Sequence, residues 1–204
     1  MTDTSQPAPH DTPERAPEEF PGRTLRRELG SWTRDLAVAL GLVLAIIVFL
    51  YQPVKVEGTS MAPLLSDQEY IFINKFVYRF EPIERGDVVV FWYPRDLSKS
   101  FIKRVVGLPG DTVEIRAGHP YVNGHELRES YVPPSYMDGL TYPAIHIPPD
   151  NYFVMGDHRD SSNDSRMFGP VPRRYIYGKA VFAYWPFEHF GSLSLPSTVN
   201  ASSQ

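Results

Sequence analysis

Two residues far apart in the sequence, Ser60 and Lys103, could together perform nucleophilic catalysis. Ser60 lies in VEGTSMAPLL (residues 56–65), where small residues precede it and Pro63 restricts the chain that follows. A serine hydroxyl is a weak nucleophile until a base removes its proton. The segment therefore predicts either an ordinary turn serine or a nucleophile whose base comes from another part of the chain.

Lys103 is a possible base because it interrupts an apolar run, SFIKRVV (residues 100–106). Side chains alternate along a strand, so Phe101, Lys103 and Val105 should share one face. Arg104 falls on the other face, and we expect one of the two cations to be partly buried. Burial disfavours the ammonium form and lowers the pKa of a lysine, which would allow Lys103 to deprotonate Ser60. The alternative is an edge strand with both cations in water.

A third polar segment, GDHRDSSNDSRMFGPVP (residues 156–172), follows the apolar run YFVM and has the composition of a loop that positions side chains. Asp157, Asp160 and Asp164 resemble calcium ligands, but the glycine and glutamate that a calcium-binding loop requires are absent at the corresponding positions. We therefore expect no metal. The favoured interpretation is a hydroxyl that orients the lysine amine and an ion pair of Asp164 with Arg166 that braces the loop.

The composition excludes several other classes of function. The chain has no cysteine, so a thiol nucleophile, a disulfide framework and a thiolate metal site are ruled out. The net charge is −4 and no basic block occurs, which argues against nucleic-acid partners. The six histidines show no metal-ligand spacing; they are His10, His119, His125, His146, His158 and His189.

The N-terminal part of the chain predicts a disordered tail and a membrane anchor. Residues 1–30 are rich in proline and charge and should form a disordered cytoplasmic tail. The run LAVALGLVLAIIVFLY (residues 36–51) has no polar face, and we expect a transmembrane helix at residues 31–53. A buried core helix and a cleaved export signal are the alternatives. Arginines before the run outnumber cations shortly after it, which predicts a cytoplasmic N-terminus and an extracytoplasmic domain.

Beyond the anchor, short β-like runs separated by turn residues predict a mainly β domain at residues 54–188. The runs lie at residues 69–78, 87–93, 100–106, 111–115, 152–155 and 178–185. Asn123 and Gly124 predict a two-residue hairpin. The proline- and tyrosine-rich residues 131–149 favour a surface loop or part of a small β-subdomain inserted near residues 111–150. Residues 189–204 are expected to form a disordered tail.

Taken together, these segments resemble the bacterial type I signal peptidases, a family of Ser/Lys proteases. The resemblance extends from the apolar run to about Trp185 and rests on four segments in order: GTSMAPLL, RGDVVVF, FIKRVVGLPGD and GDHRDSSNDSR. It implies that Ser60 is the nucleophile, Lys103 the general base and Ser162 a hydrogen-bond partner of the lysine amine. It also implies a supporting ion pair of Asp164 with Arg166.

The same resemblance implies shallow pockets for small substrate residues near Gly58, Met61, Leu65, Phe101 and Ile102. Gly58 departs from the family members that carry a hydroxyl residue two positions before the nucleophile. The oxyanion would then depend on the Ser60 backbone N–H. We expect a serine at position 58 to preserve activity or raise it modestly, unless this glycine is needed for a positive φ.

The function implied is that of a membrane-bound serine endopeptidase that removes signal peptides from exported preproteins after small-x-small motifs. Its partners would be preproteins and the lipid bilayer, and it would need neither a cofactor nor a metal. A self-cleaving repressor shares the Ser/Lys chemistry but should carry a DNA-binding module in place of the apolar run. A membrane-tethered binding domain is the non-enzymatic alternative, and the distance between Ser60 and Lys103 distinguishes it from a protease.

Overall fold

The computed structural model describes residues 22–193, without the side chains of residues 22–29, 46, 47 and 49. The chain divides into two units, residues 1–45 and residues 46–204, which are taken separately below. The described part of the first unit, residues 22–45, lies entirely within the helix α1 (Gly22–Leu50). The predicted tail at residues 1–21 lies outside the described residues.

Helix α1 begins at Gly22, so the prediction of a disordered tail up to residue 30 is wrong for residues 22–30. Leucine, arginine and glutamate in the sequence TLRRELG are good helix formers, and they extend the helix ahead of the apolar run. The side chains described between Leu36 and Val48 are exposed. Within the part of the chain that the structure covers, no helix combines the length and the hydropathy needed to cross a membrane.

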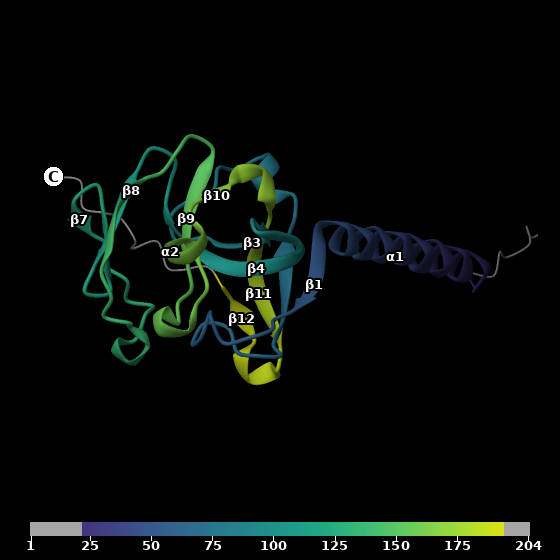
Figure 1. Ribbon diagram of the computed structural model, residues 1–204. Coiled ribbons are helices and arrows are strands. Elements are labelled where there is room, and N and C mark those ends of the chain that lie inside the picture. Colours follow the sequence, from purple (N-terminus) through teal and green to yellow (C-terminus); the bar gives the residue numbers. More distant parts are fainter. Residues whose placement is uncertain (1–21, 194–204) are drawn as a thin grey trace, which may run out of the picture. The chain divides into compact units, whose positions relative to one another are not determined.

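The second unit is built from two antiparallel sheets, which confirms the prediction of a mainly β domain (Figure 1). The larger sheet has the strand order β1-β2-β11-β3-β4-β9-β10, with β12 paired to β11. Its strands are β1 (Tyr51–Lys55), β2 (Tyr70–Asn74), β3 (Val88–Tyr93), β4 (Asp96–Gly107), β9 (Asn151–Met155), β10 (Val171–Pro172), β11 (Ile176–Trp185) and β12 (Gly191–Ser192).

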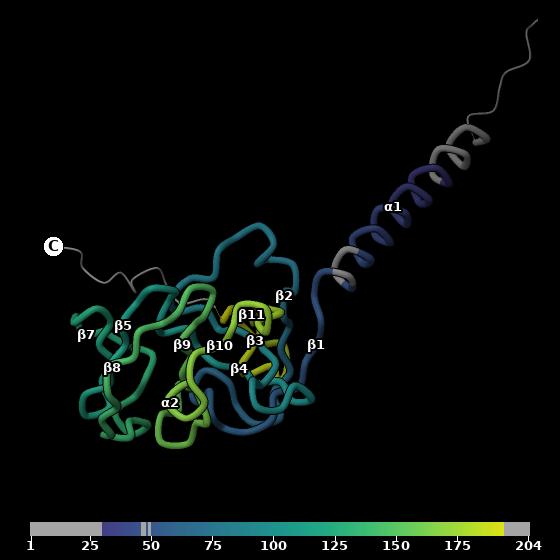
Figure 2. Tube along the Cα trace, turned by 45° about the horizontal axis from the view of Figure 1, so that its top comes forward, coloured from purple at the N-terminus to yellow at the C-terminus, as the bar shows by residue number. Residues whose placement is uncertain are grey.

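The smaller sheet has the order β7-β6-β5-β8 and lies at the opposite side of this unit from β11, as the tube view shows (Figure 2). Its strands lie in the range expected for an insert: β5 (Thr112–Arg116), β6 (His119–Val122), β7 (His125–Glu126) and β8 (Tyr142–His146). Asn123 and Gly124 connect β6 to β7 with φ angles of 53° and 84°. The predicted two-residue hairpin is therefore confirmed.

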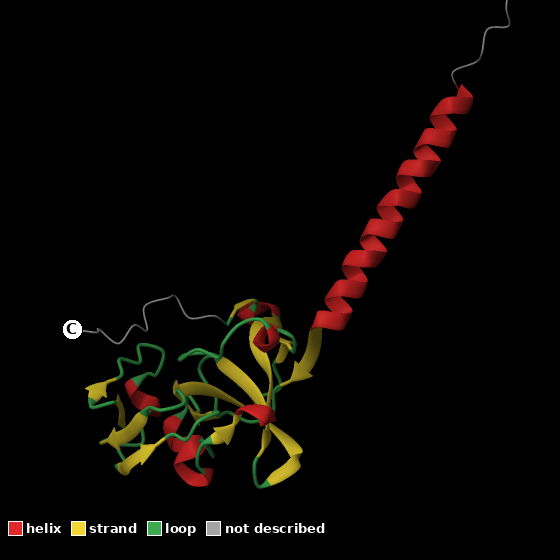
Figure 3. Cartoon of the chain, turned by 90° about the horizontal axis from the view of Figure 1, so that it is seen from above, coloured by secondary structure: helices red, strands yellow, loops and turns green. Residues whose placement is uncertain are grey.

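Short helical turns occupy the connections between strands (Figure 3). They are η1 (Val77–Arg79), η2 (Pro134–Tyr136), η3 (Arg159–Ser161), α2 (Ser165–Phe168), η4 (Arg173–Tyr175) and η5 (Phe187–His189). The run at residues 69–78 does not continue as a strand past Asn74, because the side chain of Asn74 accepts hydrogen bonds from the N–H groups of Phe76 and Val77 and turns the chain into η1. Gly191 and Ser192 pair with β11, so the predicted tail begins too early.

Three apolar clusters hold the second unit together. Two of them contain residues of the larger sheet, and the third combines Val106 and Phe153 of that sheet with Val113 and Ile115 of the smaller one. Gly107 lies at this junction, where an added Cβ would collide with the side chains of Ile147 and Val113. Burial of apolar side chains from both sheets therefore holds the two sheets together where β4 ends.

Candidate active site

Ser60 lies in the loop between β1 and β2, in a turn held by buried neighbours. The N–H of Leu65 donates to the carbonyl oxygen of Met61 at 3.0 Å, and both side chains are buried in the apolar cluster of the larger sheet. The carbonyl oxygen of Ser60 accepts a hydrogen bond from the N–H of His158 at 3.1 Å. The buried side chains therefore anchor the turn in the core, and the backbone hydrogen bond joins it to the polar loop after β9.

Lys103 lies within β4, where it is opposite Val89 of β3, and it reaches Ser60 directly. Its Nζ donates to Ser60 Oγ at 2.6 Å, and only 4% of the residue is exposed. Burial lowers the pKa of Lys103 to about 8, against the opposing influence of the Asp164 and Asp157 charges. The charge of Arg166 contributes a further lowering of this pKa. The pair expected from the sequence is therefore in contact, with a lysine that can lose its proton near neutral pH.

Arg104 is buried as completely as Lys103, whereas the sequence predicted burial of only one of the two cations. Its guanidinium donates to both carboxylate oxygens of Asp157, at 2.8 and 2.6 Å, and to the carbonyl oxygen of Gly86 at 2.9 Å. It also lies 4.1 Å from the ring centre of Tyr131. A buried arginine is tolerated here because a carboxylate far away in the sequence neutralises it, and no local pattern reveals that partner.

Asp164 and Arg166 form the ion pair that the sequence predicted. Arg166 donates to the carboxylate from Nε at 2.8 Å and from Nη2 at 2.7 Å. Asp164 also accepts from the N–H of Gly156 and caps α2 through the N–H of Arg166. Burial would raise the pKa of Asp164, but the hydrogen bonds and charge of Arg166 outweigh it and hold that pKa below its usual value. The loop is thus tied to the strand end that precedes it.

Ser162 does not form the predicted hydrogen bond with the lysine amine. Its Oγ is buried and has no hydrogen-bond partner among the residues that the structure describes, although the hydroxyl is close enough to Asp164 to favour the charged carboxylate. Gly156 packs between this hydroxyl and the nucleophile turn, because an added Cβ there would collide with Ser162 Oγ and with the carbonyl oxygen of Ser60. Because Gly156 has no side chain, the Ser162 hydroxyl and the Ser60 backbone can both pack closely against it.

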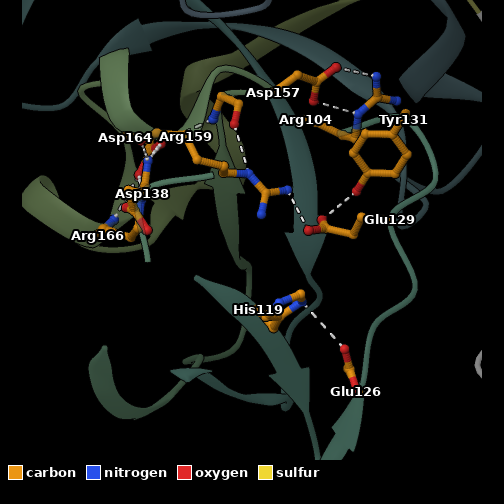
Figure 4. A network of polar contacts seen from close by, with 11 residues as sticks. Arg104, His119, Glu126, Glu129, Tyr131, Asp138, Asp157, Arg159, Asp164 and Arg166 are labelled. Carbon is orange, nitrogen blue, oxygen red and sulfur yellow. Dashed lines mark hydrogen bonds and ion pairs between the residues drawn. The ribbon is translucent and has the colours of Figure 1, made fainter. Parts of the chain in front are cut away.

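The remaining polar contacts of the site join the polar loop to the insert, and no sequence pattern predicted them (Figure 4). Arg159 binds Glu129 at 2.6 Å, and the Tyr131 hydroxyl donates to the same carboxylate. Arg166 contacts Asp138 as well as Asp164. These acceptors lie in the segment between β7 and β8, which was predicted only as a loop or part of a subdomain. The insert therefore braces the loop that is hydrogen-bonded to the nucleophile turn.

A cleft of about 470 Å³ opens beside Ser60 and Lys103. Among the residues predicted to contact substrate, Gly58, Met61, Phe101 and Ile102 line it. Leu65 does not line it, because its side chain is fully buried in the core beneath the turn. That placement gives Leu65 a structural role where a pocket residue was expected.

Gly58 adopts a φ of 91°, and its N–H donates to the Asp67 carboxylate at 2.7 Å. A residue with a Cβ is strained in this conformation by roughly 1–2 kcal/mol. A serine at position 58 would carry this strain, although its Cβ would meet no atom within 4 Å, and its effect on activity stays a prediction. The backbone favours glycine here.

No cluster of three or more potential metal ligands occurs among the residues that the structure describes. Asp157 and Asp164, two of the three carboxylates that resembled calcium ligands, are paired with Arg104 and Arg166. The polar loop therefore uses these acids to hold arginines.

Known proteins are similar to this chain over most of its length. The sequence profile described as "Signal peptidase, peptidase S26" matches residues 29–185. The chain belongs to this family. A probable signal peptidase I-1 of Synechocystis is 39% identical over 167 residues, which cover 78% of this chain and 83% of that protein. A signal peptidase I P of Bacillus subtilis subsp. natto is 38% identical over 169 residues, covering 78% and 89%.

A crystal structure of a signal peptidase I from Enterococcus faecalis is 33% identical, with a TM-score of 0.44, and covers 48% of this chain and 97% of that one. As a signal peptidase I, the enzyme is a serine protease that removes signal peptides. The alternatives of a repressor-type protease and of a binding domain without catalysis are thereby excluded.

Proposed function

We propose that Ser60 is the nucleophile of this signal peptidase and that Lys103 is its general base. The observation that carries the proposal is the 2.6 Å contact between Lys103 Nζ and Ser60 Oγ, made by a buried lysine whose pKa is about 8. No other basic side chain is needed, and the amine is neutral in a useful fraction of molecules near neutral pH.

In the first step, the neutral amine of Lys103 takes the proton of the Ser60 hydroxyl while Oγ attacks the scissile carbonyl carbon. The resulting ammonium then gives its proton to the leaving amine, and the peptide bond breaks to leave an ester on Ser60. In the second step, Lys103 removes a proton from a water molecule that attacks the ester. The lysine returns this proton to Ser60 Oγ as the carboxylic product leaves.

The developing oxyanion would be bound by the N–H of Ser60, which donates to no other group in the described chain. Gly58 supports this arrangement through its positive φ, which sets the direction of the backbone entering the turn. Asp164 and Arg166 act as positioning residues, because they brace the loop packed against Ser60 and influence the pKa of Lys103. They do not contact the reacting atoms.

We further propose that the cleft beside Ser60 accepts the small-x-small segment that precedes the scissile bond. Met61, Phe101 and Ile102 give it apolar walls, and Lys103 lines it as well. Alanine-sized side chains would fit against these walls without an acidic or basic partner. Larger residues would have to displace side chains that the core holds in place.

The test is processing of a preprotein by the wild type and by Ser60→Ala, Lys103→Ala and Lys103→Arg. Each variant should lose cleavage by at least about a thousandfold, because the dyad acts as a unit. Lys103→Arg keeps the charge but cannot supply a neutral base. Ser130→Ala and Lys99→Ala, at exposed positions outside the cleft, serve as controls and should cleave normally. Substantial cleavage by any of the three site variants would refute the assignment.

We also propose that residues 31–53 anchor the enzyme in the cell membrane, with the N-terminus cytoplasmic and the catalytic domain outside. The exposed apolar side chains of α1 support the anchor, and the arginines that precede its apolar run support this orientation. Anchoring would keep the cleft near the bilayer and raise the effective concentration of membrane-bound preproteins. A protease added outside the membrane should remove the domain and spare the N-terminal tail. A protected domain would reverse the topology.

A further inference from the structure

A second cleft, of about 410 Å³, lies at one end of the larger sheet and is lined by four cations, Lys75, Arg79, Arg173 and Arg174. No acidic side chain lines it, and within the described part of the chain none of the four forms an ion pair. The nearby Lys179, in contrast, binds Asp87 at 2.6 Å. In a chain with a net charge of −4, this cleft concentrates unneutralised positive charge.

The arginines of this basic cleft are held in place by neutral groups. Arg173 donates to the carbonyl oxygens of Tyr78 at 2.8 Å and Ile176 at 3.2 Å. The guanidinium of Arg79 lies 4.7 Å from the ring centre of Phe76. Such contacts orient the cations without cancelling their charge, so the cleft is prepared for an anion. Guanidinium groups match the geometry of phosphate oxygens in particular.

The register of the strands places the basic cleft at the end of the sheet where the chain arrives from α1. Tyr51, the first residue after the helix, is paired with Asn74 of β2, and Lys75 follows directly. Asn74 is also paired with Lys179 of β11, and Arg173 and Arg174 precede that strand. The sheet end that bears the cations is therefore the one closest in the chain to the proposed anchor.

Phe80 adds a feature expected at a lipid interface. It directly follows Arg79, and 85% of it is exposed. Trp92 and Tyr177 contribute aromatic walls to the basic cleft, with ring centres 4.9 Å apart. Aromatic side chains beside cations are typical of the headgroup region of a bilayer. An acidic protein partner would require no exposed phenylalanine at this position.

We propose that the basic cleft binds the phosphate of an anionic phospholipid headgroup. The inference rests on the membrane anchor of the proposed function, which brings this end of the sheet to the headgroups. Tyr177 lines both this cleft and the catalytic one, and its hydroxyl donates to Ser100 Oγ at 2.9 Å. A bound headgroup would thus fix the catalytic cleft at a set orientation to the bilayer surface.

The test measures lipid binding to the full chain in nonionic detergent by native mass spectrometry, with phosphatidylglycerol and phosphatidylcholine added in equal amounts. Wild type is compared with the triple variant Lys75→Gln, Arg79→Gln, Arg174→Gln, in which the backbone-bonded Arg173 is kept. The control carries the same three types of change at exposed positions elsewhere: Lys99→Gln, Arg116→Gln and Arg128→Gln. Thermal unfolding of all three proteins verifies that they are folded.

Wild type and control should retain phosphatidylglycerol in preference to phosphatidylcholine. The triple variant should bind it on the order of a hundredfold more weakly, about fivefold for each cation removed. Equal binding of the two lipids by wild type, or equal loss in the triple variant and the control, would overturn the proposal. Displacement of the lipid by an equal concentration of inorganic phosphate or of an acidic peptide would overturn it in favour of that ligand.

The outcome does not depend on the catalytic assignment. Ser60→Ala should bind phosphatidylglycerol as the wild type does, so an error about the dyad would leave this result unchanged. Protection of the domain from an external protease would refute the proposed membrane topology. Absence of a preference for phosphatidylglycerol in a correctly oriented enzyme would refute lipid binding by the basic cleft.

Discussion

Replacing Asp164 with asparagine should move the rising limb of the pH–activity profile to lower pH. The charge of Asp164 raises the pKa of Lys103, and the charge of Arg166 lowers it. Asparagine removes the charge that raises this pKa. It also strengthens the lowering by Arg166, because Arg166 loses one of its two carboxylate partners. Both changes favour the neutral amine, so the sign of the shift does not depend on their relative sizes.

The size of the effect follows from the pKa of Lys103. At a pKa of about 8, roughly a tenth of the lysine is neutral at pH 7, whereas at the ordinary value of 10.5 only about 0.03% would be. Loss of the Asp164 charge should move the rising limb of the profile down by about one pH unit. The plateau should fall as well, because the Asp164 hydrogen bonds to Gly156 and Arg166 also hold the loop against the nucleophile turn.

The assay is kcat/KM between pH 5 and 10 on a peptide whose recognition segment ends in Ala-x-Ala. The ratio of variant to wild-type activity should increase about tenfold from pH 9 to pH 6. Asp150→Asn is the matched control, since Asp150 is exposed and asparagine tolerates its φ of 56°. A ratio that is constant or falls towards low pH would refute the electrostatic reasoning, because structural damage alone lowers activity at every pH.

Three further predictions follow from the same contacts. Because the folded-state pKa of Lys103 is depressed to about 8, the cost of burying its charge is fully present below pH 8 and disappears as the pH rises to about 10.5. Lys103→Met should therefore raise the free energy of unfolding, measured by denaturant titration at pH 7, by up to about 3 kcal/mol. An equal gain at pH 10.5 would contradict this reasoning. Arg104→Met should lower that free energy by about 3–5 kcal/mol because it leaves Asp157 buried and unpaired, and adding Asp157→Leu should recover most of the loss; no recovery would show that the pair is not the cause. Gly156→Ala should reduce kcat at least about tenfold, since its Cβ displaces the Ser60 backbone, whereas Gly191→Ala, with open space around it, should be neutral in the same assay.

Much of this protein is determined by local sequence patterns. The apolar run within β4 predicted that at least part of one cation would be buried, and Lys103 is buried, although Arg104 on the other face is buried too. The Asn123–Gly124 turn defined a hairpin because both residues tolerate positive φ. The short polar loop with Asp164 and Arg166 could be identified because the two residues are only two positions apart.

The tertiary structure decided the features that depend on partners distant in the sequence. The burial of Arg104 requires Asp157, and the bracing of Arg159 requires Glu129 from the insert, contacts that no spacing rule predicts. Whether Ser162 reaches the lysine amine depends on how Ser162 and the nucleophile turn pack around Gly156, which no local pattern specifies. The basic cleft likewise joins Lys75 and Arg79 to Arg173 and Arg174, about a hundred residues later, because antiparallel pairing of β2 with β11 brings the ends of these strands together.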